Sequence, residues 1–519
     1  MSGRFCTAAL GVLWLACTPS RDDAGRGADP AASAGVAVAE PSGERPAGSQ
    51  DAGAPAVVPE AAPAAQAQAA TSPPAAVPAA AAAAAPGGAT RVYSKGRNVW
   101  IRSAPRESAS WIGALSIGGS VRLKSAEPAR SGGRDCPAFY AVEPRGYVCV
   151  DGERATLDAS DPMLTTLLAH APLVDEPLPY RYGESLGLKR LFKVEGIDAP
   201  SWPEGIHDLR HVDVRPRSSV AWTKEIEAGG QTWLWTADLT FAPKSKVKPY
   251  EPTSFRGVLL TGDVRLPIAF FRRKPRPKYR LTEDNQFAKT DAVWERLDRV
   301  GLTGKSKKVG KSTYLETRED GHWVLERDAV VVRPRKGRNP WGRPIRLAGE
   351  AGETREAREA RETLTGGPRN TWVEIAALEG WLIAYEDDRP VFATLISAGR
   401  NGAEKPVSTE PFVPPSTTPL GQYHINHKWV TKTLITPHVN QDDFIEAEVP
   451  WSQHFFSKYL VHAAYWHNNW GDGQSGGCVN LSPIDAKWLF HWTEPALPEG
   501  WHAVQVTRKD PSTRIIIHR

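Results

Sequence analysis

The sequence lacks several features that would point to a particular class of protein. Its 64 Lys and Arg residues are nearly matched by 59 Asp and Glu residues, and a net charge of +5 is small for 519 residues. This balance gives no indication of a nucleic-acid partner. Cysteine is scarce, with five residues in the whole chain. The length exceeds what one hydrophobic core usually supports and favours several domains.

The N-terminus carries a short apolar run and no segment long enough to span a membrane. In MSGRFCTAALGVLWLAC, Arg4 precedes apolar residues from Ala8 to Ala16, a length typical of a signal peptide. We therefore predict a signal peptide at 1–16. Ala16 followed by Cys17 resembles a lipoprotein processing site, with Cys17 as the lipidated first residue. The alternative is an ordinary secretory signal that is cut nearby, and both interpretations predict export.

Residues 17–89 are rich in Ala and Pro and nearly free of aromatic side chains. Such a composition cannot bury a core, so we expect a disordered tether here. Together with the signal peptide, the tether predicts a periplasmic protein that is held to a membrane as a lipoprotein.

The remaining cysteines form a pair and a single residue. Cys136 and Cys149 lie in two strand-like stretches joined by a Pro-Arg-Gly turn, and in an oxidising compartment they are expected to form a hairpin disulfide. Cys478 is left over in QSGGCVNLS, a polar stretch that contains two glycines. A buried structural cysteine usually has apolar neighbours, so this one is a candidate reactive thiol.

The patterning along the chain predicts a mainly β, multi-domain protein. Residues 91–156 alternate apolar and polar positions between Gly and Pro turns, which favours a small β-barrel. The region 160–366 is also mostly β and could include a second small barrel, but it offers no recognisable chemistry. From 371 to 508 we expect a mainly β domain with one short helix after Cys478, entered at Ser482-Pro483.

The residues around Cys478 include the groups that covalent acyl transfer requires. A cysteine attacks as its thiolate and needs a base, and His462 follows an apolar strand that could hold its ring in place. Gly477 could let backbone N–H groups face a developing oxyanion. Tyr465, Trp466 and His467 are candidate substrate-lining residues. The alternative is a core aromatic that anchors the loop for Tyr465 and Trp466, and plain solvation for His467.

A metal site is the competing interpretation of the same residues. Zinc could in principle bind His462, His467 and Cys478. Their spacing fits no common zinc pattern, and no second cysteine or downstream His pair completes four ligands. We therefore expect neither a metal nor an organic cofactor.

At this point the sequence resembles a known family. His462 followed by SGGCVN (Ser475 to Asn480) is similar to the signature of L,D-transpeptidases, in which a His precedes Ser/Thr-His-Gly-Cys-hydrophobic-Asn. The resemblance covers about 371–508 and includes TPLG at 418–421. In addition, residues 91–156 resemble the bacterial Src-homology-3-like domains that accompany cell-wall enzymes.

The resemblance implies a β-sandwich-like catalytic domain that acts on peptidoglycan stem peptides through a cysteine thioacyl-enzyme. It assigns Cys478 as the nucleophile and His462 as its base, with Ser475, Gly477 and Asn480 in supporting positions. The chain departs from the pattern at Gly476, where the family has a second His. The implied product is a three-to-three cross-link between diaminopimelate residues.

Three alternatives remain open at the level of the sequence. If water replaced the acceptor amine, the same acyl-enzyme would give an L,D-carboxypeptidase, and a cysteine amidase on the same fold would trim peptides. A non-catalytic wall-binding lipoprotein is the third alternative, since Gly476 could mark a decayed site.

Overall fold

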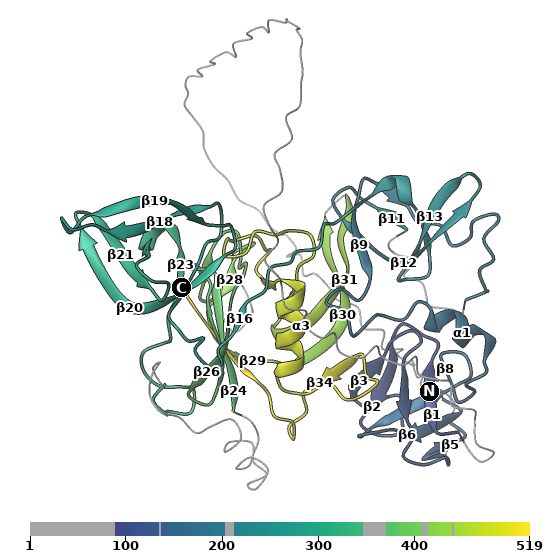
Figure 1. Ribbon diagram of the computed structural model, residues 1–519. Helices are drawn as coiled ribbons and strands as arrows, with labels where there is room; N and C mark the ends of the chain where they lie inside the picture. The colour runs from purple at the N-terminus through teal and green to yellow at the C-terminus, as the bar shows by residue number, and fades with distance from the viewer. Residues whose placement is uncertain (1–88, 134–135, 203–211, 346–369, 407–413, 439–440) are drawn as a thin grey trace, which may run out of the picture. The chain divides into compact units, whose positions relative to one another are not determined.

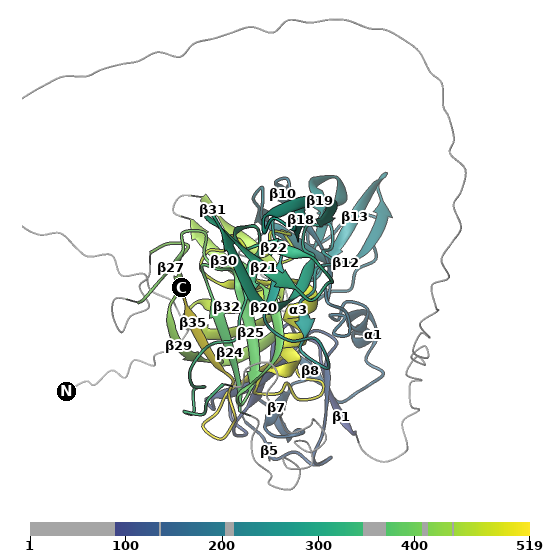
Figure 2. The same cartoon turned by 60° about the vertical axis from the view of Figure 1, so that its left-hand side comes forward.

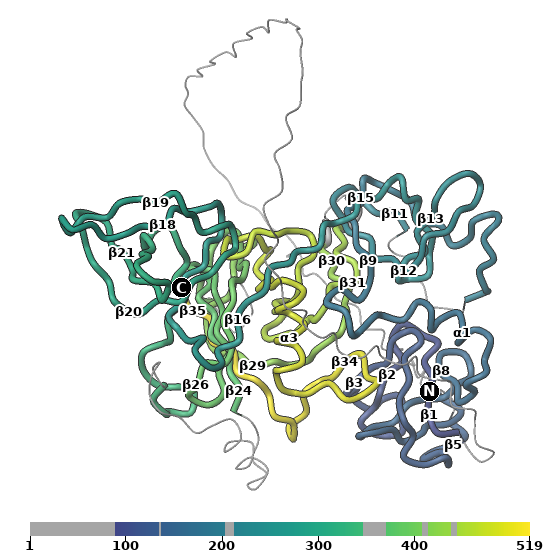
Figure 3. Tube along the Cα trace, in the orientation of Figure 1, coloured from purple at the N-terminus to yellow at the C-terminus, as the bar shows by residue number. Residues whose placement is uncertain are grey.

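The computed structural model describes residues 89–133, 136–202, 212–345, 370–406, 414–438 and 441–519, and these form a mainly β protein as the sequence predicts. The signal peptide at 1–16 and nearly all of the tether at 17–89 lie outside the described residues. Within those ranges, no helix has the length and apolar character needed to cross a membrane. Figure 1 labels the elements and Figure 3 traces the chain through them.

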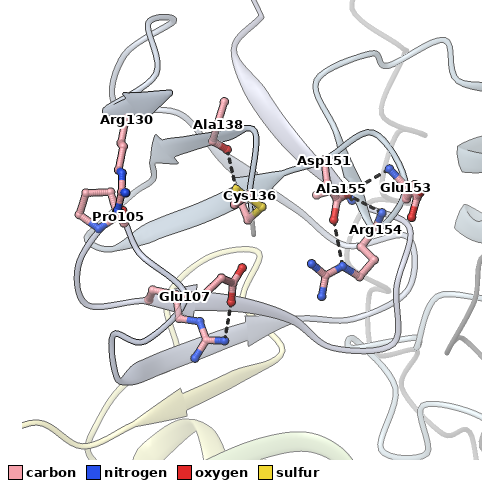
Figure 4. Close-up of a disulfide and its surroundings, with 11 residues drawn as sticks. Pro105, Glu107, Arg130, Cys136, Ala138, Asp151, Glu153, Arg154 and Ala155 are labelled. Atoms are coloured by element: carbon pink, nitrogen blue, oxygen red, sulfur yellow. Dashed lines mark hydrogen bonds and ion pairs between the residues drawn. A yellow bond between two sulfur atoms is a disulfide. The ribbon is translucent and has the colours of Figure 1, made fainter. Parts of the chain in front are cut away.

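The first β module follows the described N-terminus and contains the paired cysteines. A disulfide joins Cys136 to Cys149, the pairing expected from the sequence, and Figure 4 shows the bond beside strand β6. Its small core gathers alternate strand residues such as Val92, Ile101 and Val148. The strands are β1 (Arg91–Ser94), β2 (Val99–Arg102), β3 (Trp111–Leu115), β4 (Ser120–Arg122), β5 (Arg130–Ser131), β6 (Ala138–Ala141), β7 (Tyr147–Val150) and β8 (Ala155–Thr156).

The region 160–366 contains two further β modules after helix α1 (Pro162–Leu168). The first has a five-stranded sheet in the order β14-β13-β12-β9-β15, and the second a seven-stranded sheet in the order β19-β18-β22-β21-β20-β17-β23. Strands of the first module are β9 (Arg181–Ser185), β10 (Leu188–Lys189), β11 (Asp213–Val214), β12 (Ser219–Ala228), β13 (Gln231–Thr236), β14 (Phe241–Pro243) and β15 (Val247–Pro249). Those of the second are β17 (Ile268–Phe270), β18 (Arg276–Leu281), β19 (Phe287–Trp294), β20 (Arg299–Val309), β21 (Ser312–Thr317), β22 (Trp323–Leu325) and β23 (Val330–Val332).

The C-terminal domain places its core between two sheets. One is six-stranded, in the order β16-β26-β25-β24-β35-β29, and the other extends from β33 through β32, β31, β30 and β34 into β3 of the first module. Figure 2 labels β24 and β25 of the six-stranded sheet and β30 and β32 of the other sheet. The strands are β16 (Val258–Leu259), β24 (Thr371–Ala376), β25 (Trp381–Glu386), β26 (Arg389–Leu395), β27 (Ala403–Glu404), β28 (Thr418–Pro419), β29 (Gly421–His424), β30 (His427–His438), β31 (Gln441–Phe456), β32 (Tyr459–Ala463), β33 (Val479–Leu481), β34 (Ala503–Gln505) and β35 (Arg514–His518).

Strands β24 and β25 are buried on both faces, which explains their nearly continuous apolar sequences. Val373 and Leu382 face the core shared with helix α3 (Pro483–Trp492), whereas Trp372 and Ile383 face residues of the seven-stranded module. The expected helix after Cys478 is thus present, and the Ser482 side chain caps it by accepting from the Asp485 N–H.

The domain continues beyond residue 508, the boundary predicted from the sequence. Strand β35 pairs in parallel with β24 and antiparallel with β29, so residues up to His518 belong to the same sheet. The sequence signal was weak because the partner strand of β35 lies far away along the chain.

Candidate active site

The turn that carries Cys478 is held by a set of short polar contacts. The Ser475 hydroxyl accepts the Gly477 N–H at 3.0 Å and donates to the Cys478 carbonyl at 2.5 Å. The Thr418 hydroxyl donates to the Gly477 carbonyl at 3.0 Å and accepts the Gly399 N–H at 2.8 Å. These contacts bind the turn to β28 and to the chain after β26, so the backbone on either side of the thiol is pre-organised.

The two glycines of this turn differ in what they require. Gly477 has φ +122°, and a Cβ built there would lie 2.6 Å from both the Thr417 carbonyl oxygen and Tyr459 Cε1. Gly476 lies in the open, with no atom within 4 Å of a built Cβ. The conformation of the turn therefore requires a glycine only at position 477. A side chain at position 476, including the His of the family pattern, would extend into free space.

The sequence predicts that the N–H groups around Gly477 and Cys478 face an oxyanion, and the structure gives the first of these two groups a partner within the turn. That N–H donates to the Ser475 hydroxyl and is not free to face a substrate. The sequence does not reveal this, because a glycine at 477 allows the backbone conformation but does not show that the Ser475 hydroxyl accepts the Gly477 N–H. Gly477 and Ser475 shape the turn in this structure.

Strand pairing brings the turn that carries the candidate nucleophile beside the strand that carries the candidate base. Strands β32 and β33 run parallel, with His462 opposite Asn480. Cys478 directly precedes β33, and its thiol lies against the Leu460 N–H; His462 lies two residues farther along β32. No hydrogen bond joins the two side chains in the part of the chain that the structure describes.

The ring of His462 is oriented so that one nitrogen can accept a proton. Nδ1 lies 2.9 Å from the Ala463 carbonyl oxygen, an acceptor, so in the neutral ring the proton resides on Nδ1. The Nε2 lone pair is then available. His462 is 2% exposed, and this burial lowers the pKa of its imidazole to about 4. The ring is therefore neutral at physiological pH.

The Cys478 thiol is free and half-buried. Burial is the main effect on the thiol and raises the pKa of Cys478 to about 12; the negative charge of Glu446 adds to the rise, while the Leu460 N–H and the Lys458 charge oppose it. Sγ also lies 4.0 Å from the Lys458 carbonyl oxygen. The resting pair is thus thiol and neutral imidazole, not thiolate and imidazolium. Nothing in the sequence pattern pointed to Glu446 or Lys458.

Asn480 contacts His467, one of the predicted substrate-lining residues. The Asn469 N–H donates to His467 Nδ1 at 3.3 Å, so the ring proton belongs on Nε2, which lies 3.2 Å from Asn480 Nδ2. Two donors cannot bond, and Asn480 Oδ1 is buried without a partner among the described residues. Turning the amide by 180° lets Oδ1 accept the Nε2–H and satisfies both groups. Asn480 and His467 therefore support each other beside His462.

The other two predicted lining residues have different surroundings. Tyr465 is buried, and its hydroxyl donates to the Ala447 carbonyl at 2.6 Å and lies 2.7 Å from Ser219 Oγ, which makes it an anchor between domains. Trp466 is half-buried, with its ring centre 5.9 Å from that of His462. Among the described residues, no group of His, Cys, Asp and Glu is arranged to hold a metal ion.

The comparisons with known proteins place this site in a recognised domain. Residues 371–517 match the family model of the L,D-transpeptidase catalytic domain (YkuD). A comparison with curated proteins finds no match.

Solved structures that are similar to this chain include L,D-transpeptidase 3 from Mycobacterium tuberculosis, 13% identical, covering 47% of this chain and 81% of its own, with a TM-score of 0.22. The catalytic domain of the E. faecium L,D-transpeptidase is 19% identical and covers 30% of this chain and all of its own, with a TM-score of 0.20. TM-scores at this level carry no conclusion about the fold. The family model alone identifies residues 371–517 as an L,D-transpeptidase catalytic domain.

Proposed function

We propose that this protein is an exported L,D-transpeptidase that joins peptidoglycan stem peptides through a thioester on Cys478. The observation that supports the proposal is the parallel register of β32 and β33 within the matched domain, in which His462 lies opposite Asn480 and Cys478 directly precedes β33. The Nε2 lone pair of His462 would supply the base that the Cys478 thiol needs.

The first half-reaction forms the acyl-enzyme. His462 Nε2 accepts the thiol proton while Sγ attacks the carbonyl carbon of the third stem residue, meso-diaminopimelate. The bond from that carbon to the terminal D-Ala nitrogen then breaks, and the imidazolium returns the proton to the leaving amine. Because both groups are neutral at rest, proton transfer and attack are expected to occur together.

The second half-reaction resolves the thioester. The side-chain amine of a diaminopimelate residue on a neighbouring stem attacks the carbonyl carbon and the C–S bond breaks. The amine proton passes through His462 back to the sulfur, which leaves a three-to-three cross-link. Water in place of the amine would release a tripeptide and make the same site a carboxypeptidase.

Cys478→Ala tests the proposal directly. We expect a carbapenem to add one covalent adduct to the intact protein, seen by mass spectrometry, and no adduct in this variant. The double variant Cys136→Ala/Cys149→Ala is the matched control, because it removes both other described cysteines and should keep the adduct. An adduct that persists in Cys478→Ala would exclude this thiol as the nucleophile.

Product analysis separates the related activities. Incubation with sacculi rich in tetrapeptides should yield three-to-three dimers in the muropeptide mass spectrum. Tripeptide monomers without dimers would indicate the carboxypeptidase. Sacculus binding with neither product would indicate a non-catalytic wall-binding protein.

The membrane anchor is part of the same proposal and rests on the sequence around Cys17. We propose a periplasmic lipoprotein with Cys17 lipidated and with the module at 91–156 as a Src-homology-3-like wall-binding or spacing domain. Metabolic labelling with an alkyne fatty acid should mark the wild-type protein and not Cys17→Ala. Equal labelling of both would place the lipid elsewhere.

A further inference from the structure

The loop at 464–475 joins the two candidate catalytic residues and is held from outside the catalytic domain. It begins where β32 ends, two residues after His462, and leads to the turn that carries Cys478. Two arginines of the seven-stranded module, Arg272 and Arg273, contact this loop. Both follow the end of β17 closely and lie outside the residues that match the family model. The chain between the candidate base and the candidate nucleophile therefore depends on a module that the catalytic domain does not contain.

Arg272 contacts the backbone of the loop directly. Its guanidinium donates to the Gly471 carbonyl at 2.6 Å, and the Gly471 N–H donates to the Ile396 carbonyl at 2.9 Å, just after the end of β26. Gly471 has φ +90°, and a Cβ built there would lie 3.0 Å from Arg272 Cδ. The loop therefore passes between the arginine and the end of β26, and this close approach favours glycine.

The next residue of each segment forms an ion pair. Arg273 Nη2 lies 2.9 Å from Asp472 Oδ1, and its Nε lies 3.1 Å from Oδ2, a bidentate geometry that fixes orientation as well as distance. Arg272 Nε also lies 3.4 Å from Asp472 Oδ1, so one carboxylate receives both guanidinium groups. The Arg273 side chain is 64% exposed, and an exposed ion pair contributes little to the stability of a fold. We therefore expect this pair to act on the position of the loop more than on the free energy of unfolding.

Further contacts from outside the matched domain hold the neighbouring residues of the loop. Thr253, in the segment between the two modules, donates its hydroxyl to Asn468 Oδ1 at 2.7 Å. The same hydroxyl accepts the indole N–H of Trp470, which is fully buried, at 3.4 Å. Arg296 of the seven-stranded module donates to the Asn468 carbonyl. Backbone and side chains of the loop are thus fixed by residues that precede the catalytic domain in the sequence.

Direct contacts connect this part of the loop to the candidate catalytic residues. The ring centre of Trp470 lies 4.7 Å from that of His467, and His467 pairs with Asn480. Asn480 lies opposite His462 in the parallel register and follows Cys478 by two residues. A displacement of the loop would therefore disturb both strands beside the site. Since a misplacement of about 1 Å can cost roughly a hundredfold in rate, such a displacement would be felt in the chemistry.

We propose that Arg272 and Arg273 are positioning residues for the candidate catalytic pair, an inference that rests on the proposed function. They hold the loop, the loop holds His467 against Asn480, and this contact keeps the strand of the base aligned with the turn of the thiol. Without the two arginines the chain would still carry the thiol and its base, but the two groups would be placed less precisely. The region 160–366, for which the sequence offered no chemistry, would then contribute to catalysis through its seven-stranded module.

The first test compares Arg272→Ala with Arg276→Ala, each in the full chain. Arg276 lies in the same module and pairs with Asp328 at 3.0 Å, and among the described residues it forms no hydrogen bond or ion pair with the loop. Its side chain is 26% exposed and that of Arg272 is 32% exposed, so the two variants remove similar groups. We expect Arg272→Ala to lower the maximal rate of carbapenem addition about tenfold or more and to leave the half-saturating concentration unchanged, because the reacting groups are misplaced while access to the site is the same. Arg276→Ala should keep both values within about twofold of the parent chain, and equal losses in the two variants would overturn the proposal.

The second test uses the exposed ion pair, where a loss of folding is not expected. Arg273→Ala and Asp472→Ala should each lower the maximal rate about threefold or more, while the melting temperature stays close to that of the parent chain. Because the two side chains act as one unit, the double variant should lose no more than Asp472→Ala alone. Losses that add would show that the two residues act separately, which would contradict their role as a pair.

A parallel measurement separates this inference from the proposed function. Alkylation of Cys478 by iodoacetamide needs the thiol and its base but no recognition of a peptide, so it should slow in Arg272→Ala and not in Arg276→Ala. A wild-type chain that is alkylated but forms no carbapenem adduct would defeat the proposed function, and the alkylation rates would still decide this inference. Equal alkylation and equal carbapenem addition in the wild-type chain and in Arg272→Ala would defeat the inference alone.

Discussion

Burial keeps both members of the candidate catalytic pair uncharged. It lowers the pKa of His462 to about 4 and raises the pKa of Cys478 to about 12. At any pH between these two pKa values, the sulfur of Cys478 carries its proton and Nε2 of His462 is unprotonated, so that its lone pair can accept one. The reactive form is therefore the resting form, and no thiolate has to accumulate before attack.

This arrangement predicts an unusual pH profile for acylation. The single-turnover rate of carbapenem addition should be nearly constant from pH 5 to 9 and fall about tenfold per pH unit below pH 4, as His462 gains a proton and loses its acceptor. In His462→Ala only the thiolate fraction reacts, so the rate should be far lower and rise about tenfold per pH unit. A wild-type rate that rises through pH 7 to 9 would contradict concerted proton transfer.

Alanine substitutions at the two glycines before Cys478 are expected to change the stability of the protein by different amounts. Gly477→Ala forces a Cβ into two contacts of 2.6 Å at φ +122°, so the free energy of unfolding should fall by about 2 kcal/mol or more. Gly476→Ala enters open space and should change it by less than about 0.5 kcal/mol. Denaturant titration of both variants checks the difference, and equal losses would show that the turn is not held as described.

For single residues, the sequence reveals the candidate catalytic pair, Cys478 and His462, but not the residues that hold this pair in position. Cys478 and His462 stand out because a lone thiol on a glycine turn follows a histidine at a strand end. The contacts of Thr418, Glu446 and Lys458 with this region depend on how distant strands cross. The hydrogen bond from the Gly477 N–H to the Ser475 hydroxyl also depends on the folded turn, so the spacing of these residues in the sequence does not predict it.

Helices and strands are predictable from the sequence where a local motif marks them, and not where they depend on a strand far away along the chain. Helix α3 is predictable because Ser482 and Pro483 form a local start signal, and the helix begins there. Strand β35 escapes prediction because its burial comes from parallel pairing with β24, a partner separated by most of the domain. The strand boundaries of 160–366 were equally hidden, since short strands of a small module have little periodicity to read.

The hairpin of β6 and β7 provides a prediction about the disulfide. Cys136 and Cys149 close a loop with a sequence separation of 13, so reduction should cost about 3 kcal/mol of stability by releasing the unfolded chain. Thermal denaturation with and without a phosphine reductant measures this loss, and Cys136→Ser/Cys149→Ser should show it without reductant. Carbapenem addition to Cys478 should persist at temperatures where the reduced chain stays folded. An unchanged melting curve would mean that the hairpin holds without the bond.

Among the described residues, shared sheets join the first module and β16 to the catalytic domain, and a shared core joins it to the seven-stranded module. Strand β3 of the first module pairs with β34, and β16 pairs with β26, so catalytic-domain sheets are completed by strands from outside 371–517. Trp372, Ile383 and Tyr385 lie in one buried cluster with Phe270 and Val332 of the seven-stranded module. The modules therefore cover apolar and hydrogen-bonding surface that the catalytic domain does not cover by itself.

It follows that the catalytic domain should not fold alone. A fragment of residues 370–519 would expose the outer face of β24 and β25 and the free edges of β26 and β34, and exposed apolar strand edges promote association. We expect it to bind a hydrophobic dye, lack a cooperative melting transition and form little carbapenem adduct. A fragment of residues 89–519 keeps every contact described here and should melt and acylate like the full chain. A monomeric 370–519 fragment with a sharp transition and full acylation would show that the shared core is dispensable, and the modules would then be attachments and not part of one folding unit.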